Sequence, residues 1–269
     1  MRIDIATLFV EMCEAVMNES IIGRAREAGF IEVHCHNIRD YSPDPRHHRV
    51  DDSPYGGGKG MLMQPEPIFA CYEDICRQAG HKPYVIFLSP QGKVFSQNKA
   101  KALAAMDHIL LLCGHYEGVD QRVIDEIADE ELSIGDYVLT GGELGALVVA
   151  DAVCRLCPGV LAEEACYTEE SHWNGLLEYP QYTRPPVWHG REVPEILQSG
   201  HHANIEAWRR QRSLENTVRK RPDLIRKARL TGADKQYVEQ LKAQLKEQKA
   251  AQAAPVTPDA DSVKQNSEE

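Results

Sequence analysis

The sequence predicts an α/β protein with a mainly parallel sheet, followed by a small all-α C-terminal domain. Short apolar strands alternate with helical segments as far as Pro158-Gly159, which is the pattern of consecutive βαβ units. From Val193 onward the spacing of apolar residues is purely helical. The 269 residues are 42% hydrophobic, enough to build the core of one large domain and a small one.

The first elements follow from residue patterns near the N-terminus. Apolar and polar residues alternate over Arg2–Leu8 and again over Ile31–Ile38, so each segment is predicted to be a strand. Between them, Met12–Ala28 has helical spacing and is predicted to be one helix that ends at Gly29. The rest of this domain is predicted to begin with a polar loop over Arg39–Gly60. Three helices are predicted at Glu66–Gln78, Ser96–Met106 and Val119–Ala128. They alternate with three strands at Tyr84–Phe87, Ile109–Leu112 and Ser133–Leu139.

The second half of the chain divides by composition. An acidic stretch without periodicity, Leu161–Gly175, is predicted to be a linker or a mobile lid. Short helices are expected near Pro194, and longer ones over Asn204–Arg219, Pro222–Arg229 and Asp234–Lys249. The predicted division is an α/β domain over residues 1–160, a linker or lid over 161–178, a helical domain over 179–249 and a disordered tail over 250–269.

Three glycine-containing turns are the most informative feature for function. They are Leu88–Gly92, Cys113–Asp120 and Ser133–Glu143, and each is associated with a short apolar strand. Glycine lets the backbone pass close to a ligand, and such backbone at a helix start can bind a flat molecule through N–H and C=O groups. Any one of these segments is more often only a tight turn. Together they predict one composite pocket.

Charge is unevenly distributed along the chain. The net charge of −11 argues, at face value, against a nucleic-acid partner. From Ile205 to Leu230, however, nine basic residues are opposed by only three acidic ones. This segment fits either a solvated helix face or contact with a polyanion. Over Glu117–Glu143 the balance reverses, with nine acidic residues against Arg122 alone.

Composition also bounds the cellular setting. Eight cysteines scattered among many charged residues do not resemble a disulfide framework. The N-terminus has no signal-peptide pattern, and no apolar run is long enough to span a bilayer. A cytoplasmic protein with no membrane partner is therefore expected.

Several familiar motifs are incomplete. Gly56–Gly60 lacks the first glycine and the final Ser or Thr of a phosphate-binding loop, and no dinucleotide fingerprint follows the first strand. Cys154 and Cys157 have zinc spacing but no second pair of ligands, so they are better interpreted as small core residues. No metal-ligand set is predicted.

The glycine turns, the missing dinucleotide fingerprint and the basic helical tail together resemble the bacterial tRNA (guanine-N1)-methyltransferases, the TrmD family. The matching segments are Pro54–Gly58, Leu88–Gly92, Gly114–Asp120, Ser133–Glu143, Tyr182–Pro185 and Arg219–Asp223. The resemblance implies a SPOUT-class fold with a deep trefoil knot, and a homodimer with its active site between subunits. It also implies S-adenosylmethionine as donor, N1 of guanine 37 of tRNA as target, and assistance by Mg²⁺.

By the family pattern, Arg155 is the partner of the guanine O6 atom. The plain alternative is an arginine that ends a helix and interacts with its dipole. The family usually has Asp before Ser where this chain has Glu170, so Glu170 is expected to be the general base for the N1 proton. Glu169 is a second candidate, and an acidic lid without a catalytic role is the open alternative.

The resemblance also implies which residues bind the donor and the tRNA. The donor-binding residues come from the three glycine turns: Leu88, Ser89, Pro90, Gly114, Tyr116, Glu117, Gly118, Ser133, Ile134, Gly135, Asp136, Tyr137, Val138, Leu139, Gly141 and Gly142. The tRNA-binding residues are basic: Arg46, His47, Arg49, Lys59, Arg184, Arg209, Arg210, Arg219 and Arg221.

Five positions besides Glu170 depart from the family pattern. They are Val10, Cys13, Lys59, Gly145 and His172. These departures bear on lid geometry and rate more than on fold or substrate. Two other functions stay open: another knotted RNA methyltransferase with a different target nucleotide, and a catalytically silent RNA-binding relative.

Overall fold

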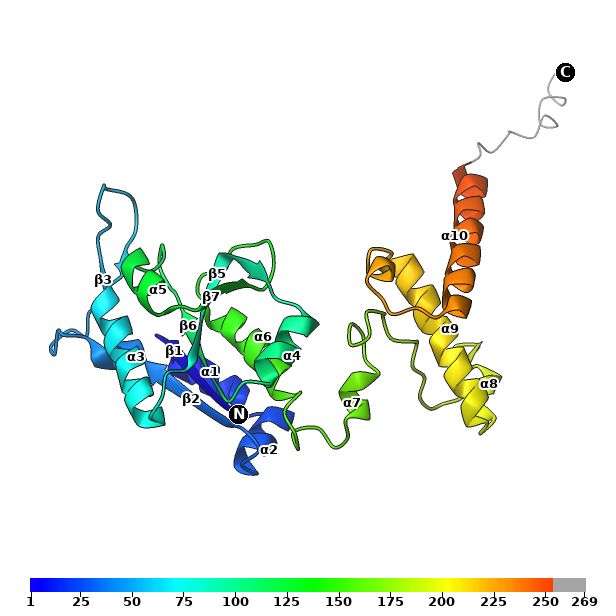
Figure 1. Ribbon diagram of the computed structural model, residues 1–269, viewed down its shortest axis with the longest axis horizontal. Helices are drawn as coiled ribbons and strands as arrows, with labels where there is room; N and C mark the ends of the chain where they lie inside the picture. The colour runs from blue at the N-terminus through cyan, green and yellow to red at the C-terminus, as the bar shows by residue number, and fades with distance from the viewer. Residues whose placement is uncertain (254–269) are drawn as a thin grey trace, which may run out of the picture. The chain divides into compact units, whose positions relative to one another are not determined.

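The computed structural model describes residues 1–253. It divides into two compact units, one over Met1–Tyr167 and one that begins at Thr168 (Figure 1). The division lies inside the segment predicted to be a linker or lid. The predicted tail over 250–269 begins within the last helix, and residues 254–269 lie outside the described part of the chain.

A five-stranded parallel sheet forms the centre of the first unit, in the order β2-β1-β6-β5-β7. Its central strand β6 is buried along its whole length, as strands covered on both faces are. The prediction of a parallel α/β sheet is therefore confirmed. The strands are β1 (Arg2–Thr7), β2 (Glu32–Asn37), β5 (Tyr84–Val94), β6 (His108–Cys113) and β7 (Glu130–Ser133), and a separate antiparallel pair is β3 (Asp51–Asp52) and β4 (Leu62–Met63).

Helices cover both faces of this sheet. α3 and α5 pack against one face, where Ile75 and Val123 join Phe87 and Leu112 of the strands in one apolar core. α1, α4 and α6 lie on the other face (Figure 1). The helices of this unit are α1 (Val10–Met17), α2 (Ser20–Glu27), η1 (Ile38–Tyr41), α3 (Pro65–Ala79), α4 (Gln97–Ala104), α5 (Gln121–Ile127) and α6 (Glu143–Cys154).

The single helix predicted over Met12–Ala28 is wrong, because the chain forms two helices, α1 and α2. The break follows Asn18, and Ser20 has a positive φ of 55° that interrupts the helical path. The chain folds back so tightly that a Cβ on Gly23 would lie 2.1 Å from the Asn18 carbonyl oxygen. Helical spacing continues across the break, which is why the pattern alone hid it. The predicted end at Gly29 is confirmed by its φ of 74°.

The first predicted glycine turn is an excursion within a strand. β5 continues past Phe87 to Val94, and its register with β7 shifts between Leu88 and Lys93, both of which pair with Leu132. Residues 89–92 therefore bulge out of the ladder and return to it. A Cβ on Gly92 would lie 2.4 Å from the Glu131 carbonyl carbon, so only glycine allows this return.

The strand predicted over Ser133–Leu139 is also wrong. β7 ends at Ser133, whose hydroxyl accepts from Gly135 N at 3.1 Å and donates to Gly135 O at 2.9 Å. Gly135 has a φ of 155°, which turns the chain away from the sheet. The apolar residues Val138 and Leu139 are exposed side chains of a loop rather than part of a buried strand.

The second unit is helical around its own small core. Leu176, Leu214, Val218, Ile225, Val238 and Leu241 form this core. The elements are α8 (Glu195–Gln198), α9 (His202–Lys220), η2 (Leu224–Arg226) and α10 (Gly232–Ala253), with α7 (Ala165–Thr168) at the division between the units. In the described part of the chain, no helix is long and apolar enough to cross a membrane.

Two predictions for the second unit need correction. It is not entirely helical, because β8 (Val187–Trp188) and β9 (Arg191–Glu192) form a hairpin. The helix predicted over Pro222–Arg229 is only the short turn η2. Proline disfavours a helical conformation for the residue before it, and Arg221 is accordingly non-helical, with φ −140° and ψ 64°.

Candidate functional site

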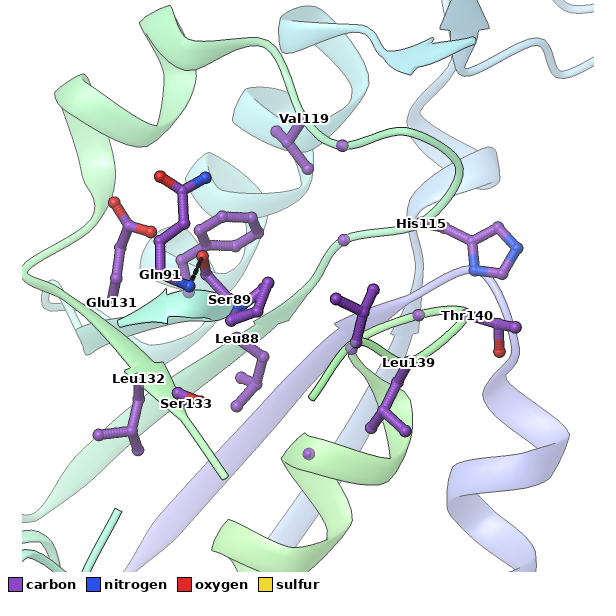
Figure 2. A pocket seen from close by; sticks show the side chains of 18 of the residues that line it. Leu88, Ser89, Gln91, His115, Val119, Glu131, Leu132, Ser133, Leu139 and Thr140 are labelled. Atoms are coloured by element: carbon purple, nitrogen blue, oxygen red, sulfur yellow. Dashed lines mark hydrogen bonds between the residues drawn. The ribbon is translucent and has the colours of Figure 1, made fainter. Parts of the chain in front are cut away.

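A cavity of about 310 Å³ opens at the carboxyl ends of β5, β6 and β7 (Figure 2). Ligand sites of open α/β sheets lie at this edge. Every predicted donor-binding residue except Asp136 lines the cavity, so the structure brings three distant chain segments together as the sequence suggested.

The first wall is the excursion of β5. Leu88, Ser89, Pro90 and Gln91 line the cavity, and the Ser89 hydroxyl accepts a hydrogen bond from Gln91 N at 3.1 Å (Figure 2). This bond holds the bulge in a defined shape. In Figure 2 the labelled Gln91 and Glu131 lie on one side of the view, and His115 and Thr140 lie on the other.

The second and third walls are joined through their main chains. Gly142 N donates to Gly114 O at 2.8 Å, and His115 forms an isolated bridge with Gly141. A Cβ on Gly142 would lie 2.8 Å from Cys113 Cα, closer than real Cβ atoms approach backbone. Glycine is required here because the loop after β6 and the loop before α6 pass so close together.

The loop after β6 is also fixed on its other side. Glu117 N donates to Met61 O at 3.0 Å, and Met63 N donates to Gly118 O at 2.9 Å. Tyr116 has a φ of 59°, so the chain turns sharply just before the two attachments. The Arg39 guanidinium donates to the Tyr116 hydroxyl at 3.1 Å, which ties this loop to η1 as well.

The third wall turns at Gly135. A Cβ there would lie 2.4 Å from Tyr137 Cε1, and the Tyr137 hydroxyl donates to Ile134 O at 3.3 Å. The tyrosine ring therefore closes over its own turn. Asp136 lies between these two residues and does not line the cavity.

Some buried polar groups beside the cavity have hydrogen-bond partners, and others do not. Glu143 is buried in the first turn of α6, where it accepts a hydrogen bond from the Thr7 hydroxyl at 2.8 Å. His115 Nδ1 is buried without a partner among the described residues. Burial raises the pKa of Cys113, at the end of β6, well above its usual range.

Sequence reasoning missed part of the lining. The additional lining residues are Leu62, Phe87, Gln91, His115, Val119, Gln121, Ile124, Glu131, Leu132, Thr140 and Gly145. Most are neighbours of predicted residues, so taking whole loops instead of motif positions would have found them. Leu62 comes from the polar loop region, where no pattern pointed to this edge.

The two predicted catalytic residues belong to different units. Arg155 is half-buried at the C-cap of α6, in the first unit. Glu170 is half-buried and is the third residue of the second unit. Neither unit by itself holds both groups. The chain after Glu170 is anchored on α9, since Leu177 N donates to the Thr217 hydroxyl at 2.9 Å.

The predicted tRNA-binding residues also divide between the units. Arg46, His47, Arg49 and Lys59 are exposed in the first unit, in a loop shaped by Asp44. In the second unit Arg184 and Arg219 have no ion-pair partner among the described residues. The other three are paired with acids in their own unit: Arg209 with Glu206, Arg210 with Asp234, and Arg221 with Asp223. Fewer guanidinium groups of this segment therefore remain for an external anion than the count of basic residues suggests.

Within residues 1–253, no group of three or more His, Cys, Asp or Glu side chains is arranged to hold a metal ion.

Comparison with known proteins identifies the family. The family model for tRNA (guanine-1)-methyltransferase TrmD matches residues 1–227. The tRNA (guanine-N(1)-)-methyltransferase of Ruminiclostridium cellulolyticum is 58% identical over 227 residues, 84% of this chain and 97% of that protein. Its counterpart from Alkaliphilus oremlandii is 53% identical over 248 residues, 90% of this chain and 99% of that protein.

A solved structure is similar over the same region. The crystal structure of tRNA (m1G37) methyltransferase from Aquifex aeolicus superimposes with a TM-score of 0.69 at 41% identity, covering 84% of this chain and 95% of that one. Fold and sequence therefore agree. The chain belongs to the TrmD family of tRNA (guanine-N1)-methyltransferases.

Proposed function

We propose that this chain transfers a methyl group from S-adenosylmethionine to N1 of guanine 37 of tRNA, just 3′ of the anticodon. The observation that carries the proposal is the single cavity to which three glycine loops bring their main chains. Family membership supports the reaction, and the Aquifex aeolicus relative is described as a tRNA (m1G37) methyltransferase.

The cavity fits S-adenosylmethionine in size and lining. Its volume of about 310 Å³ is at the lower end of small-molecule sites. Leu88, Leu132 and Leu139 offer apolar surface to an adenine ring, and the Glu117 and Glu131 carboxylates offset positive charge. The glycines let N–H and C=O groups reach the edge of a flat ring. When bound, the cofactor supplies a methyl group on a positively charged sulfur.

The residues of the chain supply the acid–base chemistry. N1 of guanine carries a proton and is a poor nucleophile until that proton leaves. The Glu170 carboxylate accepts the proton, and removal of the proton places negative charge on O6. The Arg155 guanidinium stabilises this charge. Mg²⁺ assists the reaction at a position that no described cluster of ligands marks.

The proposed enzyme is a homodimer. Phe9, Met12 and Val16 lie on one exposed side of α1, and Leu144 and Val148 are each 48% exposed on α6. α1 and α6 pack against each other, and we propose that these five exposed side chains form one apolar patch. Arg155 continues the stripe of Leu144 and Val148 at helical spacing. A second subunit that covers the patch therefore brings Arg155 into the subunit interface.

The three loops form a deep trefoil knot in this proposal. β6 lies between β1 and β5 although it follows β5 in the chain, and its loop is joined to the loop before α6. Both features are expected of a knotted SPOUT sheet. The enzyme acts in the cytoplasm, where its tRNA substrate is found.

Methylation of tRNA transcripts with guanine or adenine at position 37 tests the target. Methyl transfer from radiolabelled S-adenosylmethionine is expected with guanine and absent with adenine. Transfer to both transcripts would instead favour a different target nucleotide. Binding of both ligands without any transfer would favour a silent relative.

Replacement of Glu170 tests the base. Glu170→Gln is expected to lower the single-turnover rate by about 10²- to 10⁴-fold, the usual contribution of general acid–base catalysis. Glu170→Asp keeps a carboxylate and is expected to retain much of the rate. Glu169→Gln is the matched control and is expected to retain the wild-type rate. The opposite pattern, with the loss in Glu169→Gln, would move the base to Glu169.

A further inference from the structure

The hairpin β8–β9 presents an unusually exposed segment. All twelve residues from Gln181 to Glu192 are exposed, and among them Val187 is 51% and Trp188 59% accessible. Tryptophan is highly buried on average, because covering its ring is strongly favourable. An exposed tryptophan on an ordered element therefore indicates a surface that a partner covers.

The hairpin holds Trp188 in a fixed direction. Trp188 pairs directly across from Arg191, so their side chains lie on the same face of the two strands. The connecting residues His189 and Gly190 have φ of 50° and 72°, which is the positive-φ turn that matches strand twist. The His189 ring packs edge-on against the indole, with centroids 4.3 Å apart.

The charge beside Trp188 is positive and available. Arg191 is exposed and has no ion-pair partner among the described residues, and the same holds for Arg184 in the same segment. The one acidic residue of the hairpin, Glu192, pairs with Val187 and so lies on the opposite face. An aromatic ring beside an unpaired guanidinium is the combination that binds single-stranded nucleic acid, through base stacking and phosphate contact.

We propose that Trp188 stacks on an unpaired nucleobase of the tRNA substrate while Arg191 contacts the adjoining phosphate. The inference rests on the proposed function and adds a substrate-positioning residue outside the basic helices. A nucleic-acid partner is favoured over a protein partner, because Arg184 and Arg191 are exposed without an acidic partner among the described residues and the chain belongs to a family of tRNA-modifying enzymes. Trp208 provides a contrast: it packs against Tyr182 at 6.4 Å and Arg212 at 5.8 Å, so its ring already has partners within the unit.

Substitutions that separate stacking from apolar bulk test the proposal in the full-length protein. Trp188→Leu keeps apolar volume without an aromatic face and is expected to weaken tRNA affinity about tenfold, within the range for loss of one stacked base. Trp188→Phe is expected to keep most of the affinity. Val187→Ser changes the opposite face of the same hairpin and is expected to bind tRNA like wild type. S-adenosylmethionine affinity is expected to be unchanged in all three.

Tryptophan fluorescence gives a second readout that a structural role would not move. Titration with tRNA is expected to quench emission in the wild type, and this quenching is expected to fall in Trp188→Phe although tRNA still binds. Unchanged quenching in Trp188→Phe, or wild-type affinity in Trp188→Leu, would overturn the proposal. Dissociation of the dimer by Trp188→Leu, measured by sedimentation, would show a protein interface and also overturn it.

Failure of the proposed function is distinguishable from failure of this inference. If fluorescence quenching depends on Trp188 but guanine 37 is not methylated, the stacking proposal is supported and the assigned target is rejected. Normal methylation with no contribution from Trp188 would reject stacking alone.

Discussion

The two ends of the five-stranded sheet differ in whether their polar groups face a cavity or are paired within the protein. At the carboxyl ends, the chain leaves β5, β6 and β7 in loops whose main chain lines a cavity. In the amino-terminal half, the Asp4 side chain is completely buried, and every partner is a protein group. One end leaves main-chain groups around an open cavity, and the other pairs its buried charge within the protein.

The Asp4 cluster is dense. The carboxylate accepts from Arg2 Nε at 2.8 Å and from the Nε2 atoms of His36 and His108 at 2.5 Å each. His108 Nδ1 lies 3.2 Å from His81 Nε2, which extends the network to the surface. Burial raises the pKa of Asp4, but hydrogen bonds from His36, Arg2 and His108 outweigh it and hold the pKa well below its usual range. The buried carboxylate is therefore ionised and fully paired.

The largest effect is expected from removing that charge. Asp4→Asn leaves Arg2 and the two histidines without their common acceptor, and breaking a buried ion pair in this way costs about 3 kcal/mol or more. Urea unfolding followed by circular dichroism measures the loss. Asp107→Asn, an exposed acid at the same end of the sheet, is the control and is expected to change stability little. Equal losses in both variants would contradict the contrast between the two ends.

A smaller loss, of binding more than of stability, is expected at the other end. Gly142→Ala places a Cβ against Cys113 Cα and pushes apart the loops after β6 and before α6. We expect S-adenosylmethionine to bind at least about tenfold more weakly by calorimetry, or about 1.4 kcal/mol. Gly232→Ala, where an added Cβ meets nothing within 4 Å, is expected to leave this affinity unchanged. Wild-type affinity in Gly142→Ala would show that the junction between the loops is not needed.

Acidification is expected to have the smallest effect near neutral pH. Burial lowers the pKa of His108, although the neighbouring Asp4 opposes this shift. Because the folded-state pKa values of His108 and Asp4 are both depressed, the unfolded chain binds more protons and stability is lost as pH falls. Loss through His108 begins below the ordinary histidine pKa of about 6.5, and loss through Asp4 begins below about 3.9. Melting temperatures measured from pH 8 to pH 4 should decline, and His108→Gln should flatten the upper part of that decline.

Sequence patterns predicted the sheet and the pocket better than the chain breaks around them. Alternation and glycine positions identified the three pocket segments, because those signals are local in sequence. The division between α1 and α2 escaped notice, since the folded-back contact between Gly23 and Asn18 depends on tertiary packing. The apolar run through Val138 and Leu139 has the pattern of a buried strand, but its side chains are exposed in a loop. Whether an apolar run is buried also depends on tertiary packing, which the local pattern does not contain.

Ion pairs were equally invisible in the sequence. Arg210 was predicted to bind tRNA, but in the structure it pairs with the nearly buried Asp234 at 2.8 Å. The two residues are far apart in the sequence, and their contact depends on how α9 and α10 pack together. Charge counts along a segment therefore overestimate how many side chains remain for an external partner.

The order of strands has a consequence for how this protein is made. β6 separates β1 from β5 but is translated after both, so neither early strand finds its native neighbour on that side until residue 113 has left the ribosome. Chains emerge N-terminus first, and unpaired strand edges are prone to association. A molecule bound in the cavity cannot stabilise such a nascent chain, because the residues that line the cavity extend from Leu62 to Gly145. During synthesis, the facing edges of β1 and β5 therefore stay unpaired until β6 emerges and is inserted between them.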